Sequence, residues 1–274
     1  MNSKLLLILL ILLFIITSVI IIHKIYIKHS VEMENFYLQP IESITLNNYI
    51  PKKVYMTYYD FKKIPQYVKD NIYKYCSGYD IEIYDDKMCI DFFKKFYNNK
   101  FVDIFCDFKI GAHKADFWRY CILYIFGGFY FDIKINFITH IDNIFNINSN
   151  STWYTVLDNS NKRIFNGIIV TPKHNPILYD NIKYIYENSK PKNYLNYIIY
   201  MYKSIKKETI NNKIIIGKNN LKNNSTLILY NEICSECNKN KNNKECDRYN
   251  YKCIIENEKK KHIFNTRYND FPWK

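Results

Sequence analysis

Hydrophobic and polar residues recur with different spacings along the chain, and each spacing predicts a different element. Leu5 to Ile22 form an 18-residue run without a charged residue, about the minimum length for a helix that crosses a bilayer. This run is longer than the apolar region of a cleaved signal peptide, and no Ala-x-Ala-like cleavage site follows it. We therefore predict one N-terminal transmembrane helix.

From residue 50 onward, runs of β-branched and aromatic residues alternate with segments of helical spacing. The former predict strands and the latter predict helices. The predicted elements are a strand over Val54–Tyr58, a helix from Pro65 to about Cys76, a strand over Tyr79–Tyr84 and a helix from about Cys89 to Phe96. This βαβα order predicts an α/β fold with a mainly parallel central sheet.

A further helix and a charged strand follow. Apolar residues recur at helical spacing over His113–Phe126, and Gly127-Gly128 are expected to end that helix. The segment Phe129–Ile138 reads as a buried strand that contains Asp132 and Lys134. In an extended chain these two side chains project to the same side. A charged pair there costs desolvation energy unless a ligand binds it.

Asp116 and Arg119 lie three residues apart on the predicted helix, so they share one face near the end of that strand. The window from Gly111 to Gly128 holds six of the twelve Ala, Gly and Arg residues in the chain of 274. A chain this poor in those residues is expected to keep them where packing or chemistry needs them. Since ligands of open α/β sheets bind at the carboxyl ends of strands, we predict a functional site here.

Composition excludes some classes of protein. The chain has 39 Lys and Arg against 26 Asp and Glu, a formal net charge of +13, and 48% hydrophobic residues. That much apolar surface excludes an intrinsically disordered protein. The lysines are spread over the whole sequence and not gathered in one stripe. An N-terminal membrane anchor is also unusual for a protein that recognises a nucleic-acid sequence. We therefore expect no nucleic-acid partner.

The eight cysteines divide into two groups. Four are scattered through hydrophobic segments and read as core residues. The others lie in a polar tail with the spacing C-x2-C-x8-C-x6-C, which permits a structural zinc site or two disulfides; they are Cys234, Cys237, Cys246 and Cys253. The compartment decides between these alternatives.

The chain is expected to divide into four parts. Residues 1–28 form the anchor with short flanks, 29–49 a polar stem, 50–210 the catalytic domain, and 211–274 a C-terminal extension with the cysteine cluster. The positive charges after the anchor favour a cytoplasmic C-terminal side by the positive-inside rule. Asn-x-Ser/Thr sequons at Asn150 and Asn224 would instead permit glycosylation in a lumen.

The segment from Ala115 to Lys134, ADFWRYCILYIFGGFYFDIK, resembles the signature of glycosyltransferase family 32. That group of DxD sugar transferases includes Golgi and inositolphosphoceramide mannosyltransferases. Looser similarity runs from Ile50 to about Pro176 and includes Asn166-Gly167. The resemblance implies a GT-A-like nucleotide-sugar-binding fold and sugar transfer with retention. It also implies a Golgi- or ER-type lumen and a type II single-pass anchor, which favours disulfides over zinc.

The resemblance also implies roles for particular residues. Asp116 and Arg119 correspond to residues that hold hydroxyls of the donor sugar, and Asp132 corresponds to the first Asp of DxD. Thr57 and Tyr58 fall on the strand that contributes to the nucleotide pocket. The implied partners are a nucleotide-sugar donor, a glycan or lipid acceptor, and the membrane.

Lys134 departs from this pattern because it replaces the second Asp, the usual ligand of Mn²⁺ or Mg²⁺. An ammonium group cannot bind a divalent cation, but it can neutralise a diphosphate leaving group itself. Either the protein is metal-independent, with Asp132 and Lys134 as catalytic residues, or Asp132 holds metal with other acids such as Asp158. The leading hypothesis is a membrane-anchored hexosyltransferase. The alternative is an inactive, membrane-tethered protein that binds sugar or phosphate.

Overall fold

The computed structural model describes residues 14–24, 49–148, 151–191, 193, 195–234 and 253–268. Residues 14–24 form a helix, whereas residues 5–13 of the predicted membrane span and nearly all of the predicted stem lie outside the described part. Among the described residues, no helix is both long and apolar enough to cross a membrane.

The folded part alternates strands and helices at its start, as predicted. The helices are α2 (Gln66–Tyr75), α3 (Asp86–Phe96), α4 (Asn99–Asp107), α5 (Gly111–Phe126), α6 (Pro176–Glu187) and α7 (Asn196–Glu208), with short 3₁₀ turns at Phe61–Lys63 and Ile141–Asn143. The strands are β1 (Lys53–Thr57), β2 (Asp80–Tyr84), β3 (Gly128–Phe131), β4 (Asn136–Phe137), β5 (Thr152–Leu157), β6 (Ile164–Thr171), β7 (Gly217–Asn220), β8 (Thr226–Cys234), β9 (Cys253–Glu256) and β10 (His262–Asn265). The βαβα prediction is therefore confirmed for β1 to α3.

Local sequence explains several of these boundaries. The Asp85 side chain accepts a hydrogen bond from the backbone N–H of Met88, so α3 begins three residues before its predicted start. Helix α5 ends where Gly127 takes a φ of 66°, as the Gly-Gly pair predicts. A Cβ at Gly127 would lie 2.5 Å from the backbone nitrogen of Lys173, so that position also lacks space for a side chain.

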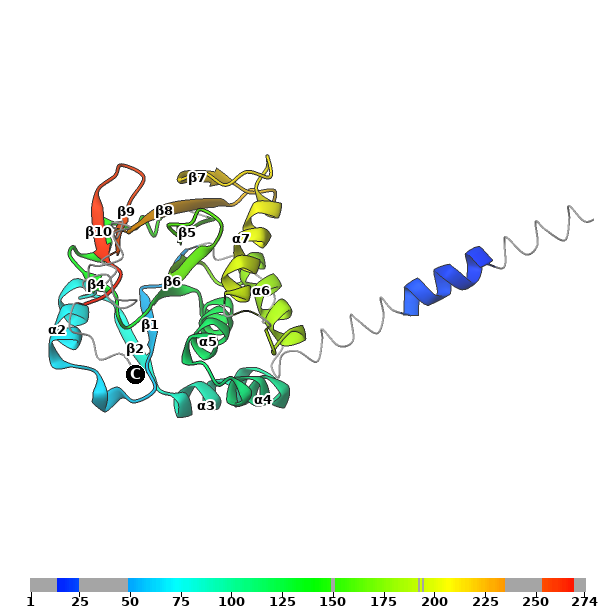
Figure 1. Cartoon of the computed structure of the whole chain (residues 1–274), viewed down its shortest axis with the longest axis horizontal. Helices are drawn as coiled ribbons and strands as arrows, with labels where there is room; N and C mark the ends of the chain where they lie inside the picture. Colours follow the sequence, from blue (N-terminus) through cyan, green and yellow to red (C-terminus); the bar gives the residue numbers. More distant parts are fainter. Residues whose placement is uncertain are drawn as a thin grey trace, which may run out of the picture.

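The sheet is mixed, and the prediction of a mainly parallel sheet is wrong. The described strands form one sheet in the order β2-β1-β3-β6-β5-β8-β9-β10-β4, with β7 also pairing with β8 (Figure 1). Only the pairs β1–β2, β1–β3 and β5–β8 are parallel. The physical reason lies in short connections: β5 and β6 are joined by six residues, too few for a parallel crossover.

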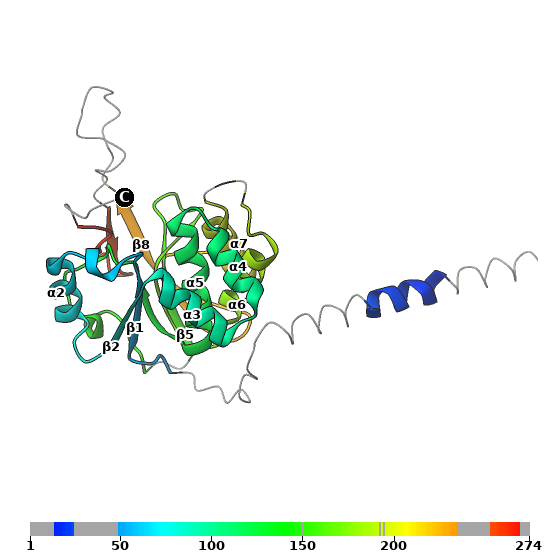
Figure 2. The ribbon, with the colours of Figure 1, turned by 90° about the horizontal axis from the view of Figure 1, so that it is seen from below.

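Two hydrophobic cores cover the two faces of this sheet. Tyr55 and Tyr130 pack in the core on the side of helices α3 to α7. Their strand neighbours Met56 and Phe131 pack in the other core, on the side of α2 and β10. The alternation is the period of two expected for strands buried on both faces. Figure 2 shows the layer of helices α3 to α7 on one side of the strands and α2 on the other.

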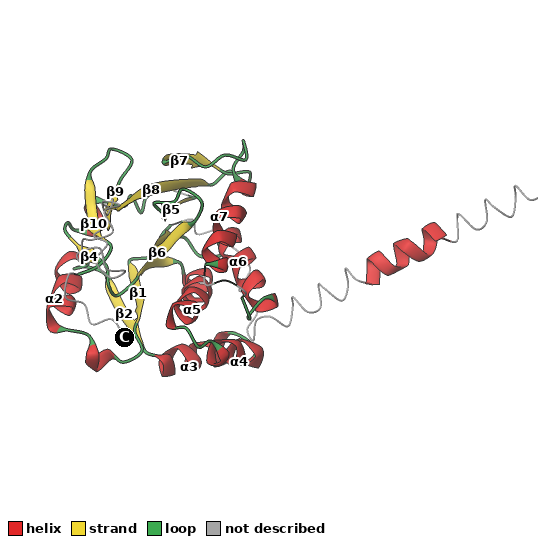
Figure 3. Ribbon diagram, viewed as in Figure 1, coloured by secondary structure: helices red, strands yellow, loops and turns green. Residues whose placement is uncertain are grey.

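Six of the described strands run in the same direction: β1, β2, β3, β5, β8 and β10. The carboxyl ends of the first five meet along one edge of the sheet. Strands β1, β2 and β3 are mutually parallel, β6 is antiparallel to β3, and β5 is antiparallel to β6. Strand β5 therefore points with β3, as does its parallel neighbour β8. Figure 3 shows the strands of the sheet in yellow beside the helices in red. This edge, which we call the carboxyl edge, carries Thr57, Asp132, Asp158 and Glu232 together with the start of β6.

The predicted strand over Phe129–Ile138 is wrong beyond Phe131. After β3 the chain turns, and the backbone N–H of Ile135 donates to the carbonyl oxygen of Asp132 over 2.9 Å. Only the two residues of β4 follow as strand, and they pair with β10. The backbone N–H of Asp132 donates to the carbonyl of Gly167 on β6, so pairing with a distant strand sets the position of this turn.

The described part of the predicted C-terminal extension belongs to the same sheet. Strand β8 lies between β5 and β9, and β10 pairs with β4, so the sheet continues across the boundary predicted at residue 210. Cys234 of β8 and Cys253 of β9 face each other in the antiparallel ladder and form a disulfide. Cys237 and Cys246 lie outside the described residues.

Candidate active site

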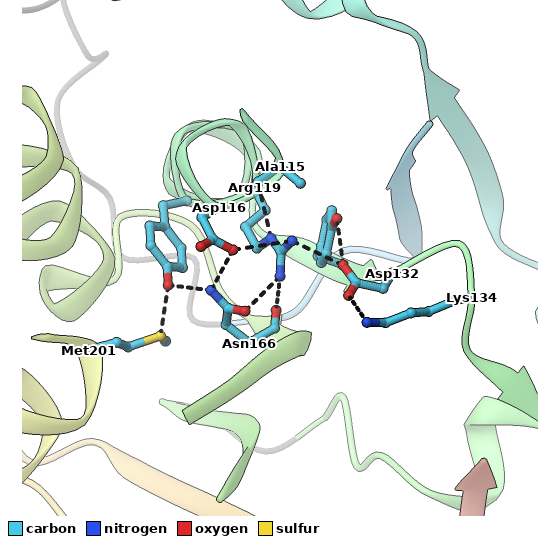
Figure 4. Close-up of polar contacts among 9 residues, drawn as sticks. Ala115, Asp116, Arg119, Asp132, Lys134, Asn166 and Met201 are labelled. Carbon is cyan, nitrogen blue, oxygen red and sulfur yellow. Dashed lines mark hydrogen bonds and ion pairs between the residues drawn. The ribbon is translucent and has the colours of Figure 1, made fainter. Parts of the chain in front are cut away.

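Helix α5 and strands β3 and β6 bring a network of charged and polar side chains to the carboxyl edge (Figure 4). Asp116 and Arg119 lie on one face of α5, as their spacing predicts, with Arg119 Nη2 3.4 Å from Asp116 Oδ1. The same Nη2 lies 3.0 Å from Oδ1 of Asp132 at the end of β3. The structure therefore brings the three predicted residues together around one guanidinium group.

Arg119 is enclosed and fully engaged. It is 3% exposed, and its three nitrogens make five polar contacts. The Nε group donates to the carbonyl of Ala115, and Nη1 donates to both the backbone and side-chain oxygens of Asn166, over 2.7 and 2.9 Å. Its plane lies over the Tyr130 ring, 4.4 Å from the centroid. Because a guanidinium has five N–H groups, Arg119 acts here by holding other residues in place.

Asn166 and Tyr120 complete the network, and sequence reasoning assigned no role to either. The amide nitrogen of Asn166 donates to Asp116 Oδ1 over 2.9 Å and to the Tyr120 hydroxyl over 2.7 Å. That hydroxyl donates in turn to the sulfur of Met201 on α7. In the sequence, Asn166 could have been identified by the polar Asn-Gly pair within the apolar segment that forms β6. A buried amide in such a segment needs hydrogen-bond partners.

Asp132 is held firmly on one side. Its Oδ1 atom accepts from the Tyr130 hydroxyl over 3.0 Å and contacts Arg119, while Oδ2 points toward Lys134. A Cβ at Gly167 would lie 2.8 Å from that Oδ2 atom, so the glycine leaves the space that the carboxylate occupies. This explains why the Asn-Gly pair contains a glycine.

The two carboxyl groups of the network differ in pKa. Burial alone would raise the pKa of Asp132, but the positive charges of Arg119 and Lys134 outweigh it, and the pKa is lowered. Burial dominates at Asp116, whose pKa is raised although Arg119 and the Asn166 amide oppose the shift. Burial would lower the pKa of Arg119, but Asp132 and Asp116 raise it. Asp132 and Arg119 are therefore both charged at neutral pH.

Lys134 lies beside Asp132 despite the turn between them. Its ammonium nitrogen is 3.6 Å from Asp132 Oδ2 and 5.8 Å from the centroid of the Phe165 ring. It also acts electrostatically on Glu232, a buried carboxyl group of β8. About 29% of the Lys134 side chain is exposed, against 3% for Arg119, so Lys134 is the more open of the two cations that contact Asp132.

Thr57 and Tyr58 lie at the same edge, next to β3. Tyr55 of β1 pairs with Tyr130 of β3 in a parallel ladder. Thr57 and Asp132 each lie two residues after this pair, so they occupy equivalent positions on the two neighbouring chains. The Thr57 hydroxyl and the Tyr58 backbone N–H both donate to the carbonyl of Tyr84 at the end of β2. The two residues therefore lie at neighbouring strand ends of the predicted site.

Comparisons with known proteins point to one chemistry. The family described as "Glycosyltransferase sugar-binding region containing DXD motif" matches residues 41–153. A relative named "Uncharacterized glycosyltransferase L373", from Acanthamoeba polyphaga mimivirus, is 28% identical over 131 residues. These matches support a glycosyltransferase. The match to this relative covers 47% of the chain and 50% of the relative, so the chain spans about half the length of the curated relative it matches.

Among solved structures, the chain is similar to one described as "PaToxG Glycosyltransferase". The two chains share 16% sequence identity and superpose with a TM-score of 0.44. The superposition covers 59% of this chain and 70% of the other.

In the part of the chain that the structure describes, the acids around Asp132 do not fit a divalent cation. Such a site takes several oxygen ligands, but Asp132 Oδ2 faces the Lys134 ammonium group and Oδ1 is already engaged by Arg119 and Tyr130. Asp158, the second predicted ligand, is paired with Arg163 over 2.9 Å. The three potential metal ligands that do cluster among the described residues are Glu232, Cys234 and Cys253, and the two cysteines form the disulfide.

Proposed function

We propose that this protein is a glycosyltransferase with a GT-A-like fold, and that it transfers a hexose from a nucleotide sugar to a glycan or lipid acceptor with retention. We further propose that it is a type II single-pass membrane protein with its catalytic domain in a Golgi- or ER-type lumen. The site at the carboxyl edge supports a bound donor, because this is where α/β sheets bind nucleotides and sugars. The disulfide between Cys234 and Cys253 supports an oxidising compartment.

Lys134 is the residue on which the proposed chemistry depends. Departure of a nucleoside diphosphate develops negative charge on the leaving oxygens, and a fixed positive charge there is the largest contribution an active site can make. Lys134 is the accessible cation beside Asp132, whereas Arg119 is enclosed. The Lys134 ammonium would contact the diphosphate directly, in the position where a metal ion acts in DxD enzymes.

The remaining predicted residues take complementary roles. Asp116 uses Oδ1 for both Asn166 and Arg119, and Oδ2 is left to accept a hydroxyl of the donor sugar. Asp132 is held by Arg119 and Tyr130 so that Oδ2 faces the ligand side. Thr57 and Tyr58, at the neighbouring strand end, would contact the nucleotide. Arg119 is a positioning residue, because its nitrogens are engaged by the protein itself.

The deciding experiment measures release of nucleoside diphosphate by the detergent-solubilised full chain. A panel of nucleotide sugars is tested, each with Mn²⁺ and with EDTA, and we expect turnover that EDTA does not abolish. Lys134→Ala and Asp132→Asn should each lower kcat by roughly 10²- to 10³-fold. Lys162→Ala, which removes an exposed lysine from the β5–β6 turn of the same edge, is the matched control and should keep the parent rate.

Each other result has a definite meaning. Parent-rate turnover by both site variants would exclude the proposed site. Turnover only with Mn²⁺ would show that acids outside this arrangement hold a metal. Binding of a nucleotide sugar without turnover under either condition would support the inactive, membrane-tethered binding protein.

A further inference from the structure

A second surface, distant in sequence from the site, combines exposed isoleucines with lysines. Three isoleucines between α7 and β7 are exposed to 59%, 48% and 38%: Ile210, Ile215 and Ile216. Beside them lies a groove of about 530 Å³ whose lining includes Ile210, Ile215, Lys213 and Lys218. Exposed β-branched apolar side chains grouped in this way mark an interaction site more often than chance exposure.

Strand pairing adds more lysines to this surface. Strands β7 and β9 lie end to end along the same edge of β8, since Gly217 pairs with Leu229 and Glu256 pairs with Asn231. A Cβ at Gly217 would lie 3.5 Å from Cβ of Glu258, which places the β9–β10 turn against the start of β7. Figure 1 shows this turn, β7 and the end of α7 along one side of the molecule.

The resulting surface is strongly basic. Its exposed lysines are Lys206, Lys207, Lys213, Lys218, Lys222, Lys259, Lys260 and Lys261. Only two acidic residues belong to the same segments, Glu208 and Glu258. We call these lysines and the three isoleucines the Ile–Lys surface. Its charge is complementary to an anionic partner. To bury the exposed isoleucines, that partner must also provide an apolar environment.

We infer that the Ile–Lys surface docks the folded domain on an anionic lipid bilayer. In such an interface apolar side chains enter the boundary between headgroups and acyl chains while lysines contact the anionic headgroups. A nucleic acid or an anionic glycan would satisfy the lysines but would leave the isoleucines in water. The segments that form this surface also contain no Phe, Tyr or Trp for stacking on bases or sugars. The inference depends neither on transferase activity nor on the lumenal placement proposed above, since anionic lipids are enriched in cytoplasmic leaflets.

The test uses the full chain in nanodiscs, so that the proposed anchor is present in every sample. Amide hydrogen exchange over 210–218 and 257–261 is compared between phosphatidylcholine discs and discs that also contain phosphatidylserine. We expect exchange to slow by roughly tenfold or more in the anionic discs, and high salt should reverse the effect because it screens the lysines.

Two variants examine the two parts of the surface. Lys213→Glu combined with Lys218→Glu should abolish the protection, and Ile215→Ser combined with Ile216→Ser should weaken it. Lys94→Glu combined with Lys95→Glu makes the same charge change on the exposed end of α3 and should leave the protection intact. All these side chains are exposed, and unchanged melting temperatures would confirm that the variants fold.

Three results would overturn the inference. The first is equal exchange in neutral and anionic discs, and the second is protection that persists in the lysine variant. The third is that a soluble polyanion such as heparin protects the isoleucine variant as well as it protects the parent. The last result would assign the surface to a polyanion and exclude a bilayer.

Discussion

Gly167→Ala is expected to impair the site through a single methyl group. The added Cβ would lie 2.8 Å from Asp132 Oδ2 and 2.9 Å from Cζ of Phe165, whereas ordinary van der Waals contact begins at 3.4 Å. The Phe165 ring can rotate away, but the Asp132 carboxylate is held by Arg119 and Tyr130, each over 3.0 Å. Asp132 must therefore move by about 0.6 Å, the difference between 3.4 and 2.8 Å, or the strand must bend.

The size of the effect follows from that displacement. A misplacement of about 1 Å in an active site costs roughly 10²-fold in rate, so we expect kcat to fall by about tenfold or more. Overpacking of this kind costs about 1–3 kcal/mol, which corresponds to a decrease in Tm of about 2–12 °C for a protein of this size. The assay is nucleoside diphosphate release, with the Tm measured on the same preparation.

Gly111→Ala is the matched control for this change. A Cβ at Gly111 meets nothing within 4 Å, and this glycine is the first residue of α5. The control should keep the parent rate and gain up to about 1 kcal/mol of helix stability. Parent values of both kcat and Tm for Gly167→Ala would refute the argument that the glycine makes room for Asp132.

Three further predictions concern the network and the disulfide. Arg119→Met should lower the free energy of unfolding by about 3–5 kcal/mol, because it leaves buried carboxyl and carbonyl groups without partners; a loss below about 1 kcal/mol in urea unfolding would contradict this. Because the folded pKa of Asp132 is lowered, its ionisation stabilises the fold above the unfolded pKa of about 3.9, and this stability is lost as the pH falls through the folded pKa. The stability difference between the parent and Asp132→Asn should therefore shrink in acid, and a difference that grows instead would disprove the sign. Reduction of the Cys234–Cys253 disulfide, which closes a loop over a separation of 19 residues, should lower stability by about 3 kcal/mol; Cys234→Ser combined with Cys253→Ser should show the same loss without reductant, and a smaller loss would mean that strand pairing alone holds β8 and β9 together.

Local patterns predicted the elements that depend on neighbouring residues. Helix α5 could be read from its helical spacing and from the glycine that ends it, and the facing positions of Asp116 and Arg119 followed from that helix. Strands β1 and β2 likewise carry their β-branched and aromatic residues in one short run each. In each of these cases the information lies within a few residues of the element that it specifies.

Long-range pairing decided what the sequence could not predict. The turn after Phe131 depends on a hydrogen bond from Asp132 to Gly167, which lies 35 residues further along the chain. The pairing of β5 with β8 joins residues 74 positions apart (226 − 152), as at Thr152 and Thr226. The antiparallel pairing of β6 with β3 and β5 makes the sheet mixed. Asn166 became recognisable as part of the site only when β6 lay beside α5, since its partners are Asp116, Arg119 and Tyr120.

Charge balance supports the proposal that Lys134 takes the place of a metal-bound aspartate. In a DxD site, the second aspartate with its divalent cation contributes one net positive charge, and the ammonium group of Lys134 contributes the same charge. Asp116, Asp132 and Arg119 keep their mutual contacts in either case, because Arg119 and not a metal holds the two carboxylates. Replacing Lys134 by Asp would change the charge of the site by two units and repel a diphosphate, whereas Ala would remove only the attraction. In EDTA, the Lys134→Asp variant should therefore bind the donor more weakly than the Lys134→Ala variant. Equal donor affinities of the two variants would mean that Lys134 does not contact the diphosphate.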